Sequence, residues 1–166
     1  MKNKLIYVIP CFLFLSLAMT CGDYDRDPFL SIHHIETIHV NNEKEFPFIS
    51  EEPIKKEAYL IGAKYFTVSQ YKEGGEVDHF PLMGFDFLVD TIYRTEITSN
   101  RALNEEFPAG SDISSCFTRT LYVPYDVTES YVLRVVPQPG IYTFFLRFYS
   151  RNGKLFESET SPIELY

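Results

Sequence analysis

Histidine is the residue type best suited to metal or acid–base chemistry in this sequence, and three of its four histidines, His33, His34 and His39, lie close together in one segment. Imidazole is a common metal ligand and titrates near neutral pH. The surrounding segment Phe29–Val40 is typical of an extended strand, on which His33 and His39 share a face but lie about 20 Å apart. That separation is too large for one metal ion, and His34 points the other way. We therefore expect surface histidines and no metal site.

Carboxylates offer a second kind of chemistry, because paired acids can hydrolyse glycosidic bonds. Asp86 and Asp90 share the outward face of a predicted strand at about 13 Å, which exceeds the spacing that glycosidases use. The sequence has no glycine-rich phosphate loop, zinc-ligand spacing or nucleophile elbow. These observations favour a protein that is not an enzyme and has no cofactor. A small hydrolase with a site assembled from distant residues is the less favoured alternative.

The cysteines are Cys11, Cys21 and Cys116. Cys11 lies inside an apolar N-terminal segment, and Cys21 follows directly after it. If that segment is removed and Cys21 is modified, Cys116 has no intramolecular partner for a disulfide. The residues around Cys116 do not resemble a catalytic site. We expect a buried structural thiol and a fold held by its core rather than by disulfides.

The apolar segment runs from Leu5 to Met19 and follows Lys2 and Lys4, which is the pattern of a signal peptide. A membrane-spanning helix is the rival interpretation, but it needs roughly 20 apolar residues. The acids that follow Cys21 end this segment earlier. The sequence therefore favours export from the cytoplasm.

The stretch Leu17-Ala18-Met19-Thr20-Cys21 resembles the lipobox of bacterial lipoproteins, in which the cysteine is diacylated and begins the mature chain. Lipoboxes usually carry leucine three places before the cysteine, where this chain has Ala18, and a small residue directly before it, where it has Thr20. Relaxed lipoboxes of this kind are familiar in the Bacteroidetes. The resemblance implies lipid attachment at Cys21 and anchoring in a lipid bilayer. An ordinary secretory leader, which would free the protein into the periplasm, is the alternative.

Three acids, Asp23, Asp25 and Asp27, follow that cysteine. The tract looks like the export signal that sends Bacteroidetes lipoproteins to the outer face of the outer membrane. A charged, solvated tether is the other interpretation, and both can hold. We therefore expect an outer-membrane anchor facing the cell exterior, or a periplasmic location. The predicted organisation is a signal peptide over 1–20, an acidic tether over 21–28 and a single domain over 29–166.

The charge balance argues against some partners. The chain has 15 basic and 23 acidic residues, a net charge of −8, and loss of Lys2 and Lys4 with the leader takes this to about −10. Such a field disfavours nucleic acid. The remaining length suffices for one domain with its own core. There are 12 tyrosines and 15 phenylalanines but no tryptophan, and the β-branched content favours strands.

Short alternating segments separated by proline and glycine turns predict an all-β fold, an antiparallel immunoglobulin-like or fibronectin-like β-sandwich of about seven strands. The segment that ends at Thr98 reads as one long strand or as two joined near Asp90. A short helical turn is also expected near 100–107. The predicted strands are Phe29–Val40, Ile54–Gln70, Met83–Thr98, Phe117–Pro124, Tyr131–Val136, Ile141–Ser150 and Ser158–Tyr166.

The last hairpin permits a prediction of register. A two-residue loop at Asn152-Gly153 would pair Phe148 with Glu157 and bury a charge, whereas a three-residue loop that adds Arg151 pairs Phe148 with Phe156. We predict the three-residue loop, with Gly153 in the left-handed region. The approach to this hairpin resembles the entry to the penultimate strand of immunoglobulin-like domains, which implies a corner tyrosine at Tyr142.

The block Asp90–Asn100, followed by Asn104–Ser111, resembles a pattern in a family of small uncharacterised Bacteroides lipoproteins. That family implies no activity. The favoured function is a non-catalytic binding or accessory module that contacts a glycan or an envelope protein, with Tyr71, Tyr125 and Tyr149 as candidate sugar-stacking side chains. A structural subunit of an envelope assembly is the alternative, and its signature would be an unpaired edge strand or an exposed apolar patch.

Overall fold

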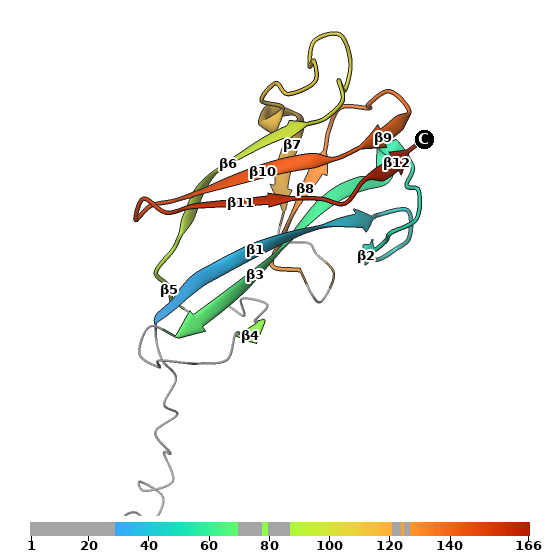
Figure 1. Ribbon diagram of the computed structural model, residues 1–166. Coiled ribbons are helices and arrows are strands. Elements are labelled where there is room, and N and C mark those ends of the chain that lie inside the picture. Colours follow the sequence, from blue (N-terminus) through green and yellow to red (C-terminus); the bar gives the residue numbers. More distant parts are fainter. Residues whose placement is uncertain (1–28, 70–77, 80–86, 121–123, 125–126) are drawn as a thin grey trace, which may run out of the picture.

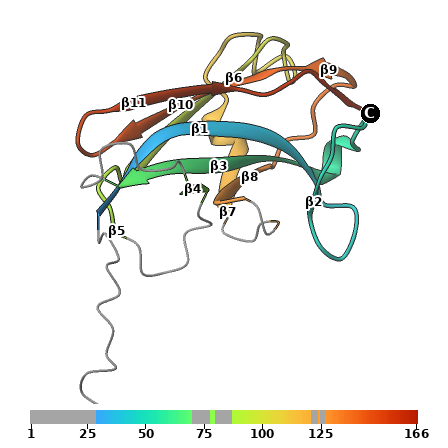
Figure 2. The same ribbon diagram turned by 60° about the horizontal axis from the view of Figure 1, so that its bottom comes forward.

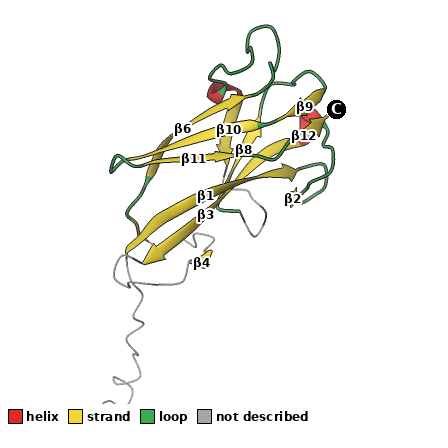
Figure 3. Cartoon of the chain, viewed as in Figure 1, coloured by secondary structure: helices red, strands yellow, loops and turns green. Residues whose placement is uncertain are grey.

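The computed structural model of the chain describes residues 29–69, 78–79, 87–120, 124 and 127–166. These residues form an all-β sandwich (Figures 1 and 3), which confirms the predicted fold class. The sequence predicted about seven strands; the described residues form twelve, because several loops contain short paired segments. The elements are β1 (Phe29–Asn41), β2 (Phe48–Ile49), the 3-10 turn η1 (Lys56–Ala58), β3 (Tyr59–Ser69), β4 (Asp78–His79), β5 (Phe87–Leu88), β6 (Ile92–Ser99), the 3-10 turn η2 (Ser114–Cys116), β7 (Phe117–Thr120), β8 (Glu129–Leu133), β9 (Gly140–Tyr142), β10 (Phe144–Ser150), β11 (Leu155–Glu159) and β12 (Ile163–Leu165).

The larger sheet has the order β2-β1-β3-β8-β7, with β4 paired to β3 and β5 paired in parallel to β1. Its central strands β1 and β3 are antiparallel along nearly their whole length. The register between them shifts between Ile32 and His34, which is a β-bulge that exchanges the faces of the strand. Ile32 faces the core before the bulge and Ile35 faces it afterwards.

The smaller sheet, β11-β10-β6, lies over β1, β3 and β8 as the second layer (Figure 2). Along β10 the residues alternate between buried and exposed, because successive side chains of a strand point to opposite faces. Phe144 and Phe148 are fully buried and contact aromatic rings of the larger sheet: the Phe144 ring centroid lies 5.3 Å from that of Tyr59, and the Phe148 centroid 6.3 Å from that of Tyr65. These contacts join the two layers.

The register of the β10–β11 hairpin confirms the prediction from the sequence. Phe148 is paired with Phe156. The amide of Ser150 donates to the carbonyl of Lys154 at 3.0 Å, so three residues form the loop between them. Gly153 has a φ of 86°, a conformation that glycine adopts at little cost.

The chain closes with a third, two-stranded sheet of β9 and β12. The predicted final strand, Ser158–Tyr166, is divided at Pro162 between β11 and β12, because proline lacks the N–H that a continuing ladder needs. Tyr142 at the end of β9 is fully buried, and its hydroxyl donates to the carbonyl of Gln138 at 2.6 Å. This bond to the backbone four residues earlier confirms the predicted corner tyrosine.

The helical turn expected near 100–107 is absent, and the segment is a series of bends. The amide of Leu103 donates to the carbonyl of Phe107 at 3.0 Å, the reverse of the direction in a helix. The Asn104 side chain accepts hydrogen bonds from the amides of Glu106 and Phe107. Such local side-chain bonds compete with helix formation and favour a turn.

In the segment predicted as Met83–Thr98, the described residues from 87 onward form two strands, β5 and β6, separated around Asp90, so the interpretation as two strands is confirmed for this part. Asp90 itself was expected on the outward face, and this expectation is wrong because the residue is fully buried. Its Oδ2 accepts from the backbone amide of Ile32 at 2.8 Å and from Lys154 Nζ at 3.0 Å. Its Oδ1 accepts from the side-chain amide of Asn152. Asp90 therefore ties the hairpin loop to β1.

Candidate functional site

The outer face of the smaller sheet carries a regular array of exposed and half-buried side chains. Each odd-numbered residue of β10 has one cross-strand partner on β11 and one on β6. Rows of partners follow one another at about 7 Å along the strands. The three rows are Glu159-Phe145-Thr98, Glu157-Arg147-Glu96 and Leu155-Tyr149-Arg94.

The middle row is a charged network centred on Arg147. Its Nε donates to Glu157 Oε1 at 2.8 Å, and its Nη1 lies 3.9 Å from Glu96 Oε1. The hydrogen bond to Glu157 raises the pKa of the Arg147 guanidinium above its ordinary value. The Tyr149 hydroxyl also donates to Glu96, at 3.0 Å. Both acids of this row are therefore already engaged within the protein.

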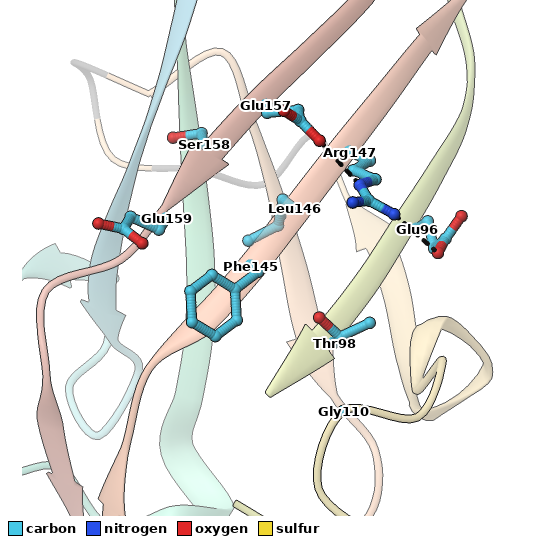
Figure 4. A pocket seen from close by; sticks show the side chains of 9 residues that line it. All are labelled: Glu96, Thr98, Gly110, Phe145, Leu146, Arg147, Glu157, Ser158 and Glu159. Carbon is cyan, nitrogen blue, oxygen red and sulfur yellow. Dashed lines mark hydrogen bonds and ion pairs between the residues drawn. The ribbon is translucent and has the colours of Figure 1, made fainter. Parts of the chain in front are cut away.

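A groove of about 620 Å³ lies over the first two rows. Figure 4 shows the ring of Phe145 between Glu159 and Thr98, with Arg147 and its two acidic partners beside it. The loop at Gly110 lines the groove as well, and the Gly110 amide donates to the carbonyl of Ser99 at 2.8 Å, which fixes this loop to β6. The groove thus has a floor of rigid, paired strands.

Two side chains of the groove, Phe145 and Glu159, are available to contact a ligand. Phe145 is 40% exposed although it is a large apolar residue on the outward face. Glu159, its partner on β11, makes no side-chain hydrogen bond or ion pair with any described residue. An exposed aromatic ring beside an unused carboxylate can hold a ligand by stacking and by a directional polar contact.

A second polar cluster lies inside the sandwich and is centred on Glu129, which is 1% exposed. Its Oε1 accepts from the hydroxyls of Tyr65 and Tyr131, each at 2.5 Å, and its Oε2 is ion-paired with Arg119. Burial, followed by the charge of Glu129, raises the pKa values of Tyr65 and Tyr131 well above their usual range. A smaller hollow of about 200 Å³ between β6 and β7 reaches Arg119 and Tyr131. With its carboxylate already occupied by three partners, this cluster links β3, β7 and β8 of the larger sheet. The Tyr131 hydroxyl, 2.9 Å from Thr95 Oγ1, connects it to β6 of the other layer.

Among the described strands, β7 lies at an edge of the larger sheet and pairs with β8 alone. The amide of Arg134 donates to the Cys116 carbonyl, so position 116 bonds toward β8. Alternation along an antiparallel ladder then directs the backbone N–H and C=O of Arg119 away from β8.

The structure corrects one expectation about the histidines. His39 is buried rather than on the surface, because the bulge in β1 turns it inward; His33 and His34 are exposed. The Tyr59 hydroxyl lies 2.9 Å from His39 Nδ1, and the Ser161 carbonyl accepts from Nε2 at 2.8 Å. Burial lowers the pKa of His39 below its ordinary value, although the Ser161 bond opposes this.

The other predicted residues fall into two groups. Cys116 is buried, and burial raises the pKa of its thiol, as expected for a structural cysteine. Tyr149 lies on the outer sheet face beside the groove. The remaining candidates lie outside the described residues: Cys21, Asp23, Asp25, Asp27, Tyr71, Asp86 and Tyr125.

The sequence did not single out Phe145 or Glu159. A signal for Phe145 was present, since it is a large apolar residue at an outward position of an alternating strand. Glu159 offered no such signal, because its position beside the ring depends on the hairpin register. Among residues 29–69, 78–79, 87–120, 124 and 127–166, no group of three or more His, Cys, Asp or Glu side chains could hold a metal ion. No helix within these residues is both long and apolar enough to cross a membrane.

The fold and the groove define an all-β sandwich with a polar, half-open hollow on one outer sheet face. Comparison with known proteins adds no relative: no family model, no curated protein and no solved structure matches this chain.

Proposed function

We propose that this protein is a lipid-anchored, non-catalytic binding module whose groove over β6, β10 and β11 is the ligand-binding surface. The observation that carries this proposal is the exposed ring of Phe145 on the floor of that groove, beside the unengaged carboxylate of Glu159. A ligand that covers the ring removes apolar area from water, at about 25 cal/mol per Å². The paired strands beneath hold the contact residues in place before the ligand arrives.

The lipid anchor belongs to the same proposal and rests on the sequence. Cys21 is the attachment site, and Asp23, Asp25 and Asp27 direct the protein to the outer face of the outer membrane, in the manner of the Bacteroidetes surface lipoproteins that the leader resembles. The corner formed by Tyr142 supports an immunoglobulin-like ancestry for the sandwich behind the tether. A module displayed in this way would meet glycans or envelope proteins.

Binding is tested with the intact acylated protein in detergent micelles. Neutral, amino and acidic oligosaccharides and short basic, acidic and neutral peptides serve as probes. We expect at least one probe to bind, and Phe145→Ala to weaken it about tenfold or more. Ile141→Ala is the matched control, since Ile141 is 59% exposed but lies on β9 outside the groove. If Phe145→Ala binds the probe as tightly as Ile141→Ala does, the ligand-binding site lies outside the groove.

The anchor is tested separately on intact cells. Labelled palmitate should enter the wild-type protein and not Cys21→Ala, and protease added outside the cells should digest the wild-type protein. Palmitate incorporation that persists in Cys21→Ala would reject Cys21 as the lipid attachment site. Resistance to external protease would indicate a location behind the outer membrane.

The unpaired edge of β7 favours a second candidate function, a structural subunit of an envelope assembly. The Arg119 backbone groups could accept a strand from another chain, which is a recurrent mode of recognition. A stable complex lost on Arg119→Pro, which removes the edge donor, but retained by Arg119→Ala and by Phe145→Ala would support this alternative over the groove. Arg119→Ala is the control because it loses the same ion pair with Glu129 but keeps the backbone N–H.

A further inference from the structure

An aromatic ring lies near a carboxylate at two places on the outer sheet face: Tyr149 near Glu96, and Phe145 near Glu159. At the first place, a cation of the chain itself, Arg94, lies over the ring. The guanidinium carbon of Arg94 lies 5.2 Å from the centroid of the Tyr149 ring, and its Nη2 lies 3.4 Å from Glu96 Oε2. Arg94 reaches this position because it is the cross-strand partner of Tyr149 on β6. A cation over an aromatic face is attracted by the ring quadrupole.

The equivalent place in the first row lacks that cation. The cross-strand partner of Phe145 on β6 is Thr98, an uncharged residue, and its partner on β11 is Glu159. Within the described part of the chain, no Lys or Arg is recorded over the Phe145 ring, and the Glu159 carboxylate has no partner. Ring and carboxylate both face the groove.

We propose that this groove takes the guanidinium group of an arginine side chain from a partner polypeptide, which lies over Phe145 and pairs with Glu159. The inference rests on the proposed binding function of the same groove and names its ligand class. A guanidinium is planar, stacks on aromatic faces and donates in a fork that matches a carboxylate. It would repeat at Phe145 the contact between cation and ring that Arg94 makes at Tyr149, with the carboxylate supplied from β11 instead of β6.

Charge and space both agree with such a ligand. Among the described residues that line the groove are three acids, Glu96, Glu157 and Glu159, and one cation, Arg147, and the whole chain carries a net charge of −8. This field attracts a basic partner over a distance. The volume of about 620 Å³ leaves room for the backbone that presents the side chain. An amino sugar also carries a positive charge, but it lacks the planar fork, so the test includes it as a separate probe.

The probe is a short fluorescent peptide of alternating arginine and serine, titrated into the intact acylated protein in detergent micelles. The matched peptide contains citrulline, an uncharged analogue of nearly the same shape, in place of arginine. We expect the arginine peptide to bind at least about tenfold more tightly than the citrulline peptide, and its affinity to fall as salt is added. Equal affinity for the two peptides would overturn the inference.

Three variants locate the contact. Phe145→Leu removes the ring and Glu159→Gln removes the charge, and each should weaken the arginine peptide about tenfold. Thr98→Arg places a cation beside Phe145 as Arg94 stands beside Tyr149, so it should block the peptide. Glu164→Gln, on the exposed side of β12, is the control and should bind like wild type. Unfolding midpoints close to that of wild type confirm that all four variants are folded. Wild-type binding by Thr98→Arg or by Glu159→Gln would overturn the inference.

Oligosaccharides distinguish this inference from the proposed function on which it rests. Glucosamine oligomers carry a positively charged amine where N-acetylglucosamine oligomers carry a neutral acetamide, and the two are otherwise the same. If either binds in a manner that depends on Phe145 while the arginine peptide does not bind, the groove remains the binding surface and the arginine ligand is rejected. If no probe depends on Phe145, both proposals fail.

Discussion

Phe145 and Glu159 stand directly opposite each other on β10 and β11, at a position where the two strands do not exchange hydrogen bonds. Such pairs bring their Cα atoms to about 4.5 Å, closer than hydrogen-bonded pairs. An exposed apolar ring and a carboxylate without a described partner are thereby held side by side on a rigid surface. Neither residue is needed for the core, which β10 builds with its alternate residues.

Asp90 should make the fold sensitive to acid. Burial raises the pKa of its carboxyl, but the hydrogen bonds from Asn152, Lys154 and the Ile32 amide outweigh burial and leave the pKa below its ordinary value. A carboxyl with a lowered folded pKa stabilises the protein above its unfolded pKa of about 3.9 and loses that contribution as the pH falls through the folded value. Asp90→Asn should cost about 2 kcal/mol at neutral pH and flatten the decline below about pH 4. Urea unfolding of wild type and variant at several pH values measures both effects; parallel curves would contradict this role.

His39 should make the stability of the fold depend on pH closer to neutrality than Asp90 does. Because burial lowers its pKa, the unfolded chain takes up a proton at about pH 6.5 before the folded protein does. The free energy of unfolding should therefore fall as the pH drops from 7 toward 5, and this decline should be smaller in His39→Gln. Ile141→Ala, at an exposed position without a titratable group, is the control and should retain the wild-type slope. A wild-type slope in His39→Gln would refute the prediction.

Glu129 is the acceptor on which the internal polar cluster depends. Glu129→Leu leaves two buried tyrosine hydroxyls and Arg119 without their acceptor, so it should cost about 3 kcal/mol. Glu129→Gln keeps an acceptor oxygen and should cost less. Denaturant unfolding gives the two values, and a leucine variant as stable as wild type would show that the cluster does not stabilise the fold.

The hydroxyl group of Tyr142 should contribute to the stability of the fold. Tyr142→Phe keeps the buried ring, which packs on Phe144 at a centroid distance of 5.8 Å, but removes the donor to Gln138 and to the Ala102 carbonyl. We expect a loss of about 1 to 2 kcal/mol in the free energy of unfolding. Tyr93→Phe, at a residue 61% exposed, should change it little. Equal losses in the two variants would argue against a special role for the corner.

Local periodicity made much of the fold predictable. The alternation along Ile141–Ser150 and the charge at Glu157 sufficed to choose the hairpin register and the conformation of Gly153, because a wrong register would have buried a charge. The short segments around Cys116 and Tyr142 were likewise interpreted correctly from their neighbours.

What the sequence did not predict depends on contacts between distant residues. The bulge after Ile32 reverses the faces of β1 and buries His39, and its position follows from pairing with β3. Asp90 is buried because Ile32, Asn152 and Lys154 meet it in space. The groove combines three strands, so Phe145 could not be placed beside Glu159 until the sheet order was known.

Ligand binding in the groove over β6, β10 and β11 can be located residue by residue. The isotope-labelled protein is titrated with the tightest-binding probe of the oligosaccharide and peptide panel, and its backbone amide resonances are followed. We expect the largest shifts at Thr98, Phe145, Arg147 and Glu159, with little change in β7. Shifts confined to β7, with the resonances of the groove unmoved, would contradict ligand binding in the groove.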